Sequence, residues 1–129
     1  MTSHHPRADR FAAALRHFEE TGDIHELSRQ FADNAELIRP EVSKSAVSAH
    51  DLTEFWNRYR SQFSHVRTDF TRIDESGRIA VLEWVSTGRL EAGRDIEYRG
   101  VSLLTFDGND EVRRFATYYD TAAFVQPEN

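Results

Sequence analysis

The stretch from Tyr98 to Asp120, YRGVSLLTFDGNDEVRRFATYYD, decides the fold that this sequence predicts. An apolar run at residues 101–106 leads into the turn-forming cluster at 107–110, and a second run begins at Val112. Asp and Asn tolerate turn geometry because their side chains bond their own backbone, and Gly accepts a positive φ without steric cost. The stretch therefore predicts a hairpin whose second strand ends in two tyrosines and the carboxylate of Asp120.

Asp120 is the first candidate catalytic residue, because a carboxylate on a half-buried strand is costly to desolvate unless something uses it. Aromatic surroundings disfavour the charged form of a carboxylate, which suits general acid–base catalysis. Tyr118 is the second candidate, since the two-residue period of a strand places it on the face of Asp120, where its hydroxyl can donate to a substrate oxygen. The alternatives are that Asp120 caps the turn at Thr121 and that Tyr118 is pocket wall.

Glu83 is the third candidate, an acid on an otherwise aliphatic face of the strand expected at residues 79–90. Whether it faces the same side as Asp120 depends on the register of the last hairpin, because a slip of one residue reverses the answer. The alternative is an ion pair with an arginine such as Arg99 or Arg114.

The chain before the hairpin predicts more strands and, further upstream, helices. Alternating apolar residues predict a strand at 66–73, and turn signals at 74–77 and 91–94 bound the long strand at 79–90. Apolar residues spaced i, i+3, i+4 and i+7 predict helices in the first half. The elements expected there are a helix over 7–20, a shorter helix from Asp23 to Phe31, a strand over 35–39, a loop over 41–49 and a third helix from Asp51 to Phe63.

Three helices and one early strand, followed by a four-stranded antiparallel meander, predict an α+β fold with the helices on one face of the sheet. Both faces of the strand at 79–90 are largely apolar, whereas an antiparallel sheet with one solvated face should alternate. We therefore expect the second face to meet another copy of the chain, in a homodimer formed through the sheet.

Composition narrows the possible partners. The 129 residues suit one domain spanning 1–129. Sixteen basic and 22 acidic residues give a net charge of −6, which argues against nucleic acid or an anionic membrane surface as a partner. No apolar run approaches the ~18 residues of a membrane span, and the N-terminal residues lack the hydrophobic segment of a secretory signal, so a cytoplasmic location is expected.

Motifs for metals and cofactors are missing from the sequence. There is no cysteine, which excludes disulfides, thiol catalysis and thiolate metal sites in this chain. His25 and Glu26 lack the second histidine of an HExxH zinc signature, and the glycines are too scattered for a phosphate loop or dinucleotide fingerprint. We expect neither a metal nor an organic cofactor.

Aromatic residues on the expected helices and strands are candidates for the lining of a ligand pocket, with ordinary core as the alternative. About half of this set is expected to touch a cavity. The set comprises Phe18, Trp56, Tyr59, Phe63, Phe70 and Trp84.

Three phrases, in this order and spacing, carry a resemblance to a known family: FADNAELIRPEV at 31–42, LEWVSTGRL at 82–90 and YRGVSLLTFDGNDEVRRFATYYDTAAF at 98–124. Over about residues 8–125 the chain resembles the nuclear transport factor 2-like superfamily and, within it, the SnoaL-like proteins. The resemblance implies a conical fold, in which a curved sheet wraps round a long helix and encloses an apolar pocket, and commonly a sheet-to-sheet dimer. Members include polyketide cyclases, ketosteroid isomerases, limonene epoxide hydrolases and non-enzymatic binding domains, so the fold alone does not name a reaction.

The residues that match the family's catalytic positions agree only in part. The resemblance places an acid that handles protons at the position of Asp120, and the epoxide hydrolases favour Glu83 on the same face. Val85 and Thr87 stand where the epoxide hydrolases have an arginine and an aspartate, and the first helix has no tyrosine to complete an isomerase oxyanion hole.

Two functions remain open from the sequence. The first is cofactor-free acid–base catalysis, as in an isomerase, cyclase or hydrolase, on a small apolar cyclic or polyketide-like compound. The second is a non-catalytic dimeric module that binds a ligand or a protein.

Overall fold

The computed structural model of the protein describes residues 4–125, in which six strands form one open sheet in the order β2-β1-β6-β5-β4-β3. The strands are β1 (Phe31–Arg39), β2 (Val42–Lys44), β3 (Phe63–Ser76), β4 (Ile79–Leu90), β5 (Asp95–Phe106) and β6 (Val112–Tyr119). The helices are α1 (Pro6–Thr21), α2 (His25–Ser28), α3 (Ala49–Ser61) and the 3₁₀ helix η1 (Thr121–Phe124). The α+β architecture with helices packed on a mostly antiparallel sheet is confirmed.

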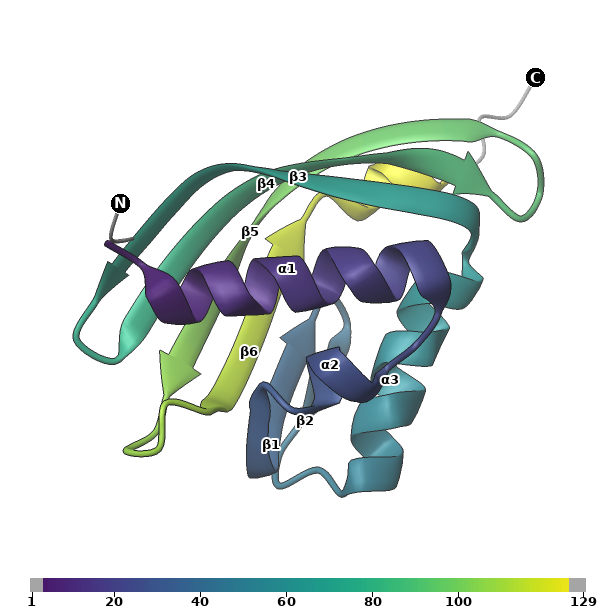
Figure 1. Cartoon of the computed structure of the whole chain (residues 1–129). Helices are drawn as coiled ribbons and strands as arrows, with labels where there is room; N and C mark the ends of the chain where they lie inside the picture. Colours follow the sequence, from purple (N-terminus) through teal and green to yellow (C-terminus); the bar gives the residue numbers. More distant parts are fainter. Residues whose placement is uncertain (1–3, 126–129) are drawn as a thin grey trace.

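Helix α1 crosses the strands on the inner face of the curved sheet, and α3 stands on the same side near the end of α1 (Figure 1). Pro6 opens α1 in its first turn, where a missing N–H costs nothing. Gly22 ends it at φ 78°, with its N–H donating to the carbonyl of Phe18. Phe11 and Phe18 are fully buried between α1 and the sheet. This aromatic packing fills the interior at one end of the sheet, and a hollow remains at the other end.

Around Phe31, the structure differs from the sequence prediction. Phe31 belongs to β1 and not to the second helix, which ends at Ser28. Phe31 pairs with Val112 of β6 in a parallel ladder, and the register shifts before Glu36. Asn34, at φ 60°, lies in this irregular stretch. The polar residues at 32–34, which the sequence pattern suggests as a helix break, therefore form a bulge inside β1. Pairing with β6, a strand far away in the sequence, makes this segment a strand.

Two smaller differences lie on either side of α3. The expected loop over 41–49 contains the short strand β2, which pairs with the end of β1. Phe63 begins β3 and does not end α3, because the helix stops at Ser61. Phe63 matches the apolar spacing of α3 but pairs with Leu90 of β4.

A bulge in β6 sets which side chains face inward. Phe106 pairs with Val112 and Thr105 pairs with Arg114, so Arg113 is an extra residue in the strand. After this bulge, the inward positions are Phe115, Thr117 and Tyr119, and the intervening residues face outward.

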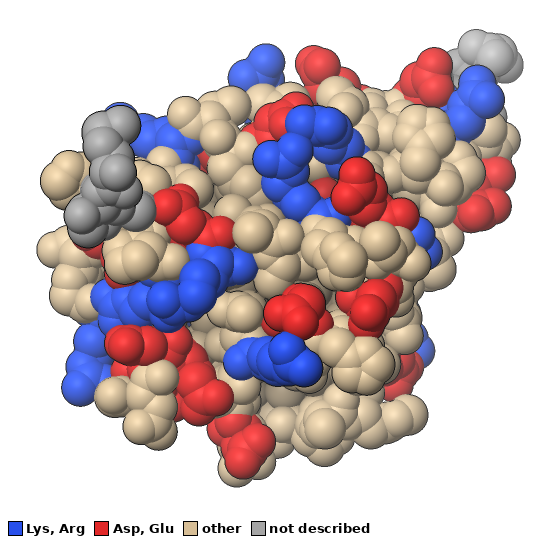
Figure 2. Space-filling model, in the orientation of Figure 1, with Lys and Arg blue, Asp and Glu red and all other residues tan. Residues whose placement is uncertain are grey.

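Charged side chains of both signs intermingle on the face that carries α1 (Figure 2). Arg7, in the first turn of α1, has a structural role. Its guanidinium pairs with Glu75 at 2.7 Å and with Asp110 at 3.2 Å. These pairs fix the start of α1 to two strand turns. Within residues 4–125, no helix combines the length and apolar character that crossing a bilayer requires.

Candidate functional site

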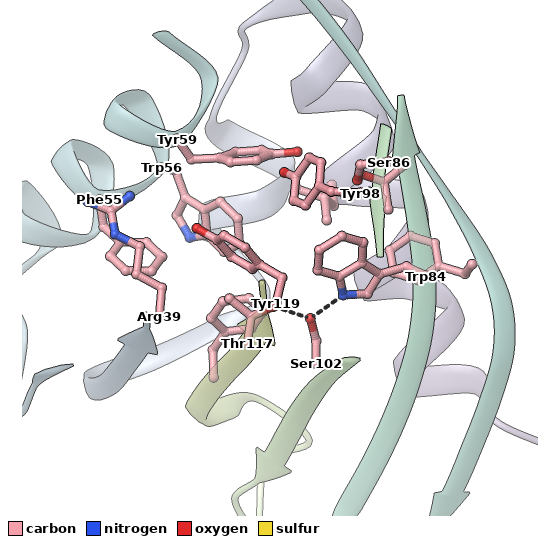
Figure 3. A pocket seen from close by; sticks show the side chains of 14 residues that line it. Arg39, Phe55, Trp56, Tyr59, Trp84, Ser86, Tyr98, Ser102, Thr117 and Tyr119 are labelled. Atoms are coloured by element: carbon pink, nitrogen blue, oxygen red, sulfur yellow. Dashed lines mark hydrogen bonds between the residues drawn. The ribbon is translucent and has the colours of Figure 1, made fainter. Parts of the chain in front are cut away.

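A hollow lies between α3, the second half of α1 and the inner faces of β3–β6 (Figure 3). Its cavity volume is about 50 Å³, room for a few water molecules. Aromatic rings and hydroxyls dominate the lining, which consists of Leu15, Arg39, Phe55, Trp56, Tyr59, Thr68, Phe70, Trp84, Ser86, Tyr98, Ser102, Phe115, Thr117 and Tyr119.

Asp120 does not line this hollow. It is exposed, and its carboxylate accepts the N–H of Ala122 at 2.9 Å as the N-cap of η1. The expectation of a buried acid at the end of the last strand is wrong, and the capping alternative describes the residue. The reason is that β6 ends one residue earlier, at Tyr119.

Tyr118 and Glu83 also lie away from the hollow. Tyr118 is 45% exposed on the outer face, and its neighbour Tyr119 lines the hollow in its place. Glu83 is exposed on the outer face of β4, with its carboxylate 3.9 Å from the guanidinium of Arg72. The ion-pair alternative for Glu83 therefore holds, although its partner is Arg72 and not Arg99 or Arg114.

Four of the six aromatic candidates line the hollow: Trp56, Tyr59, Phe70 and Trp84. Phe18 is fully buried in the core under α1. Phe63 packs in a second aromatic cluster, against Tyr59, Tyr98 and Phe124. More of the set therefore touches the hollow than the half that was expected.

Glu19, on α1, is the buried acid that the sequence interpretation missed. Its side chain is 4% exposed and sits behind the wall of the hollow. The hydroxyl of Tyr59 donates to its carboxylate. Thr68 donates twice, from its backbone N–H to Oε1 at 2.9 Å and from its hydroxyl to Oε2 at 2.6 Å. Three donors, two of them hydroxyls that line the hollow, therefore converge on one carboxylate.

The hydroxyl network continues across the sheet. Thr68 Oγ1 is 2.7 Å from Ser86 Oγ, and because the Thr68 proton is given to Glu19, Ser86 is the donor in this bond. Figure 3 shows the oxygens of Tyr59, Tyr98 and Ser86 gathered along one side of the hollow. Three elements, α3, β3 and β4, thus place hydroxyls in one hydrogen-bonded chain that ends on Glu19, and the hydroxyl of Tyr98 from β5 lies beside it.

Burial raises the pKa of Glu19 above its ordinary value, and the hydrogen bonds from Thr68 and Tyr59 offset only part of the increase. Burial also raises the pKa of Tyr59 far above its ordinary value, and the Glu19 charge adds to this effect. The pKa of Tyr98 rises mainly through burial. The tyrosines are therefore neutral donors, and Glu19 is the group in this network whose protonation state changes most readily.

A second polar chain lies on the opposite side of the hollow and is fully satisfied. Trp84 Nε1 donates to Ser102 Oγ at 3.0 Å, and Ser102 Oγ is 2.9 Å from Thr117 Oγ1. The indole of Trp84 lies across Gly100, where a Cβ would be only 2.4 Å from the ring. The missing side chain of Gly100 therefore makes the space that directs Trp84 into the wall.

The sequence does contain a signal for Glu19. It lies four residues after Leu15 and eight after Phe11, so it shares the apolar stripe of its helix. A charged residue on a buried stripe needs partners. Those partners, Tyr59 and Thr68, come from two other elements, α3 and β3, which the sequence alone does not bring together.

The described residues contain no group of three or more His, Cys, Asp or Glu side chains that could hold a metal ion. The hollow itself offers aromatic walls, hydroxyls that lead to one buried carboxylate, and the guanidinium of Arg39.

Comparison with known proteins identifies a family that this sequence matches. The family model described as SnoaL-like domain matches residues 8–115. The resemblance inferred from the three sequence phrases is confirmed. No functionally curated protein matches the chain.

Solved structures share the fold at low sequence identity. An NTF2-like protein of unknown function from Burkholderia pseudomallei is 15% identical with a TM-score of 0.81, covering 96% of this chain and 95% of that one. An NTF2-like protein from Anabaena variabilis is also 15% identical with a TM-score of 0.81, covering 95% and 96%. An LEH-like epoxide hydrolase from M. tuberculosis is 11% identical with a TM-score of 0.70, covering 92% and 86%.

Proposed function

This chain belongs to the SnoaL-like domain family, and on that premise we propose that it binds a small, largely apolar cyclic or polyketide-like molecule in its hollow and moves a proton on it without a cofactor. The single observation that carries the proposal is the carboxylate of Glu19, buried behind a wall of hydroxyls and held by Tyr59 and Thr68. A buried acid with a raised pKa that is coupled to a cavity is the arrangement that acid–base catalysis uses.

Tyr59 is the group that carries the proton between ligand and carboxylate. As Tyr59 takes a proton from an acidic C–H or O–H of the ligand, its own hydroxyl proton passes to Glu19. The ligand–hydrogen bond breaks, a new Tyr59 O–H bond forms, and a Glu19 O–H bond forms. Return of the proton by the reverse path, to the same or another ligand atom, regenerates the site. The net reaction is an exchange or an isomerisation that consumes no co-reactant.

The size of the hollow sets a condition on binding. Small-molecule pockets usually measure about 300–1,000 Å³, whereas this hollow measures about 50 Å³. A ring therefore enters only when a wall side chain moves. Tyr119, a half-buried residue of the lining at the end of β6, is the side chain best placed to do so.

Hydrogen–deuterium exchange into a bound compound tests the proposal without knowledge of the reaction. A thermal-shift screen of cyclic ketones and polyketide-like phenols selects compounds that stabilise the fold. Each compound is then followed by NMR in D₂O with the protein. We expect catalysed exchange of one C–H, slowed about 100-fold or more in Glu19→Gln, with binding retained. Glu20→Gln, on the exposed side of α1, is the matched control and should exchange at the wild-type rate.

Passive binding is the second candidate, and the small hollow and the outward position of Asp120 favour it. In that case compounds stabilise the fold but exchange no faster than in buffer. Exchange no faster than in buffer, with wild type and with Glu19→Gln alike, would decide for the passive module.

We also propose that two chains pair through the outer face of the sheet. An apolar row crosses four strands there, with Val81 beside Leu103, Leu103 beside Ala116, and Ala116 beside Ile38. Light scattering should give a dimer for the wild type and a monomer for Leu103→Glu. The net charge of −6 and the absence of cysteine suit a cytoplasmic protein that binds neither nucleic acid nor membrane.

A further inference from the structure

Trp56 carries a polar group that nothing in the described chain satisfies. Its Nε1 is the one buried side-chain nitrogen or oxygen within residues 4–125 that has no hydrogen-bond partner. The residue is 3% exposed and lines the hollow. Leaving a buried donor unpaired costs about 1–3 kcal/mol. By contrast Trp84, the other tryptophan of the chain, donates to Ser102.

Arg39 lies on the same side of the hollow. It ends β1 and is the single charged residue of the lining. Its guanidinium carbon lies 5.0 Å from the centre of the Phe55 ring, and no acidic side chain of the described residues pairs with it within 4.0 Å. Glu41, in the next turn, is near enough to raise the pKa of Tyr119 but forms no ion pair with Arg39.

Phe55 connects these two donors. Arg39 stacks on its ring, and the Trp56 indole packs edge-on against it, with the ring centres 5.3 Å apart. In Figure 3 the indole nitrogen of Trp56 lies on the side of Arg39 and Tyr119, across the hollow from Ser86. Burial raises the pKa of Tyr119, and the nearby Arg39 charge offsets part of this increase, so Arg39 and Tyr119 interact. This end of the hollow therefore offers donors and positive charge, and the end at Thr68 offers hydroxyls backed by a carboxylate.

We infer that Arg39 and Trp56 Nε1 form a subsite for a carboxylate, and that the ligand is a planar ring compound that bears one. This inference rests on the proposed function, because it assigns the orientation of a ligand in the same hollow. A carboxylate accepts from a guanidinium and an indole N–H together, and it supplies the acceptor that Trp56 lacks. The positive charge of Arg39 attracts the carboxylate to its end of the hollow, which places the ring near Tyr59.

The nitrogen of Trp56 exposes less than 1 Å² of surface, so a carboxylate reaches it only when a neighbouring side chain moves. Tyr119 is half-buried and on the same wall. The geometry thus couples entry of the ligand to movement of Tyr119.

Benzoate, methyl benzoate and inorganic phosphate test the subsite on the intact protein. Calorimetry should show that benzoate binds roughly tenfold or more tightly than its uncharged ester, as expected for a charge-assisted hydrogen bond. In Arg39→Met this preference should disappear while ester affinity changes less than about twofold. Arg58→Met, which removes an exposed arginine that pairs with Glu54 on α3, is the matched control and should keep the preference.

The two indole N–H signals in a ¹H–¹⁵N NMR spectrum provide a second readout, assigned with Trp56→Phe. Benzoate should move the Trp56 signal and leave the hydrogen-bonded Trp84 signal in place. Equal affinity for acid and ester, no benzoate binding, a shift confined to Trp84, or an equal response to phosphate would each overturn the carboxylate subsite. The wild-type comparison of acid with ester decides the question even if Arg39→Met does not fold.

The deuterium experiment separates this inference from the proposed function. In one outcome, neutral ring compounds exchange in a way that requires Glu19 while benzoate is not preferred. That outcome would support the proposed function and contradict the carboxylate subsite. Benzoate binding that depends on Arg39, without exchange that depends on Glu19, leaves the subsite and removes the catalysis.

Discussion

Tyr118 and Tyr119 are neighbours in β6 and occupy opposite faces of the sheet. Tyr118 is 45% exposed on the outer face, whereas Tyr119 lines the hollow on the inner face. The same contrast separates two glutamates. Glu83 lies exposed on the outer face of β4, and Glu19 is buried on the inner side with three donors on its carboxylate. Side-chain direction, and not residue type, decides which of these groups is available for chemistry.

The inner face also carries the stability of the fold, while the outer face is free to form an interface. Leu104 and Leu103 are adjacent in β5 and identical in type, but Leu104 is fully buried and Leu103 is half-buried on the outer side. This pair makes the difference between the two faces measurable, because the two positions carry the same side chain.

The largest effect is expected from Leu104→Ala. Removing a fully buried leucine leaves a cavity and should lower the free energy of unfolding by about 2–5 kcal/mol in urea denaturation. Leu103→Ala, its matched control, should cost about 1 kcal/mol at low protein concentration, because less of its side chain leaves water on folding. At high concentration its cost should rise if the outer face forms the dimer. Similar losses for both variants at low concentration would contradict the assignment of the faces.

Gly100→Ala is expected to have the next largest effect. A Cβ at this inner-face position would lie 2.4 Å from the Trp84 ring and 2.5 Å from the carbonyl oxygen of Tyr118. The indole must shift, which should cost about 1–3 kcal/mol and change the fluorescence of Trp84. Gly108→Ala, where a Cβ meets no atom within 4 Å, should leave stability and fluorescence nearly unchanged. A fluorescence spectrum unaltered by Gly100→Ala would show that Trp84 does not depend on this gap.

The sequence predicts the elements of the fold better than it predicts the faces. Local apolar spacing and turn residues are sufficient for α1, α3 and the meander, since each pattern extends over many residues. They fail at Phe31 and at Arg113, where a bulge shifts the register through pairing with a distant strand. One extra residue in β6 exchanges the faces that follow it, which turns Tyr119 inward.

The sequence also predicts the wrong catalytic residues, because it does not determine which face of the sheet each side chain occupies. Asp120, Tyr118 and Glu83 were selected by the local surroundings of their strands, and all three are exposed. Trp56, Tyr59, Phe70 and Trp84 do line the hollow, because burying a large aromatic ring in the interior is strongly favourable. Glu19 depends on partners from α3 and β3 that only the folded chain assembles.

Glu19→Gln should change how stability depends on pH. The folded protein holds the Glu19 proton more tightly than the unfolded chain does, because burial raises its pKa. The stability that this proton provides is complete below the ordinary value of 4.5 and is lost as pH rises through the raised pKa. Urea midpoints of wild type and Glu19→Gln should therefore diverge above about pH 4.5, with the wild type falling relative to the variant. Glu20→Gln, its exposed neighbour, should follow the wild type at every pH, and parallel curves for Glu19→Gln would contradict the raised pKa.

The smallest effect is expected from Glu83→Gln, the same chemical change on the other face. The Glu83 and Arg72 side chains are 53% and 69% exposed and their charged atoms are 3.9 Å apart, so water and salt screen the pair. We expect no measurable change in the urea midpoint between pH 4.5 and 8, and no change in the deuterium exchange of a bound compound. A loss of exchange in Glu83→Gln comparable to that in Glu19→Gln would show that the outer face contributes to the chemistry. Such a loss would overturn the proposal that only groups on the inner side of the sheet take part in the chemistry.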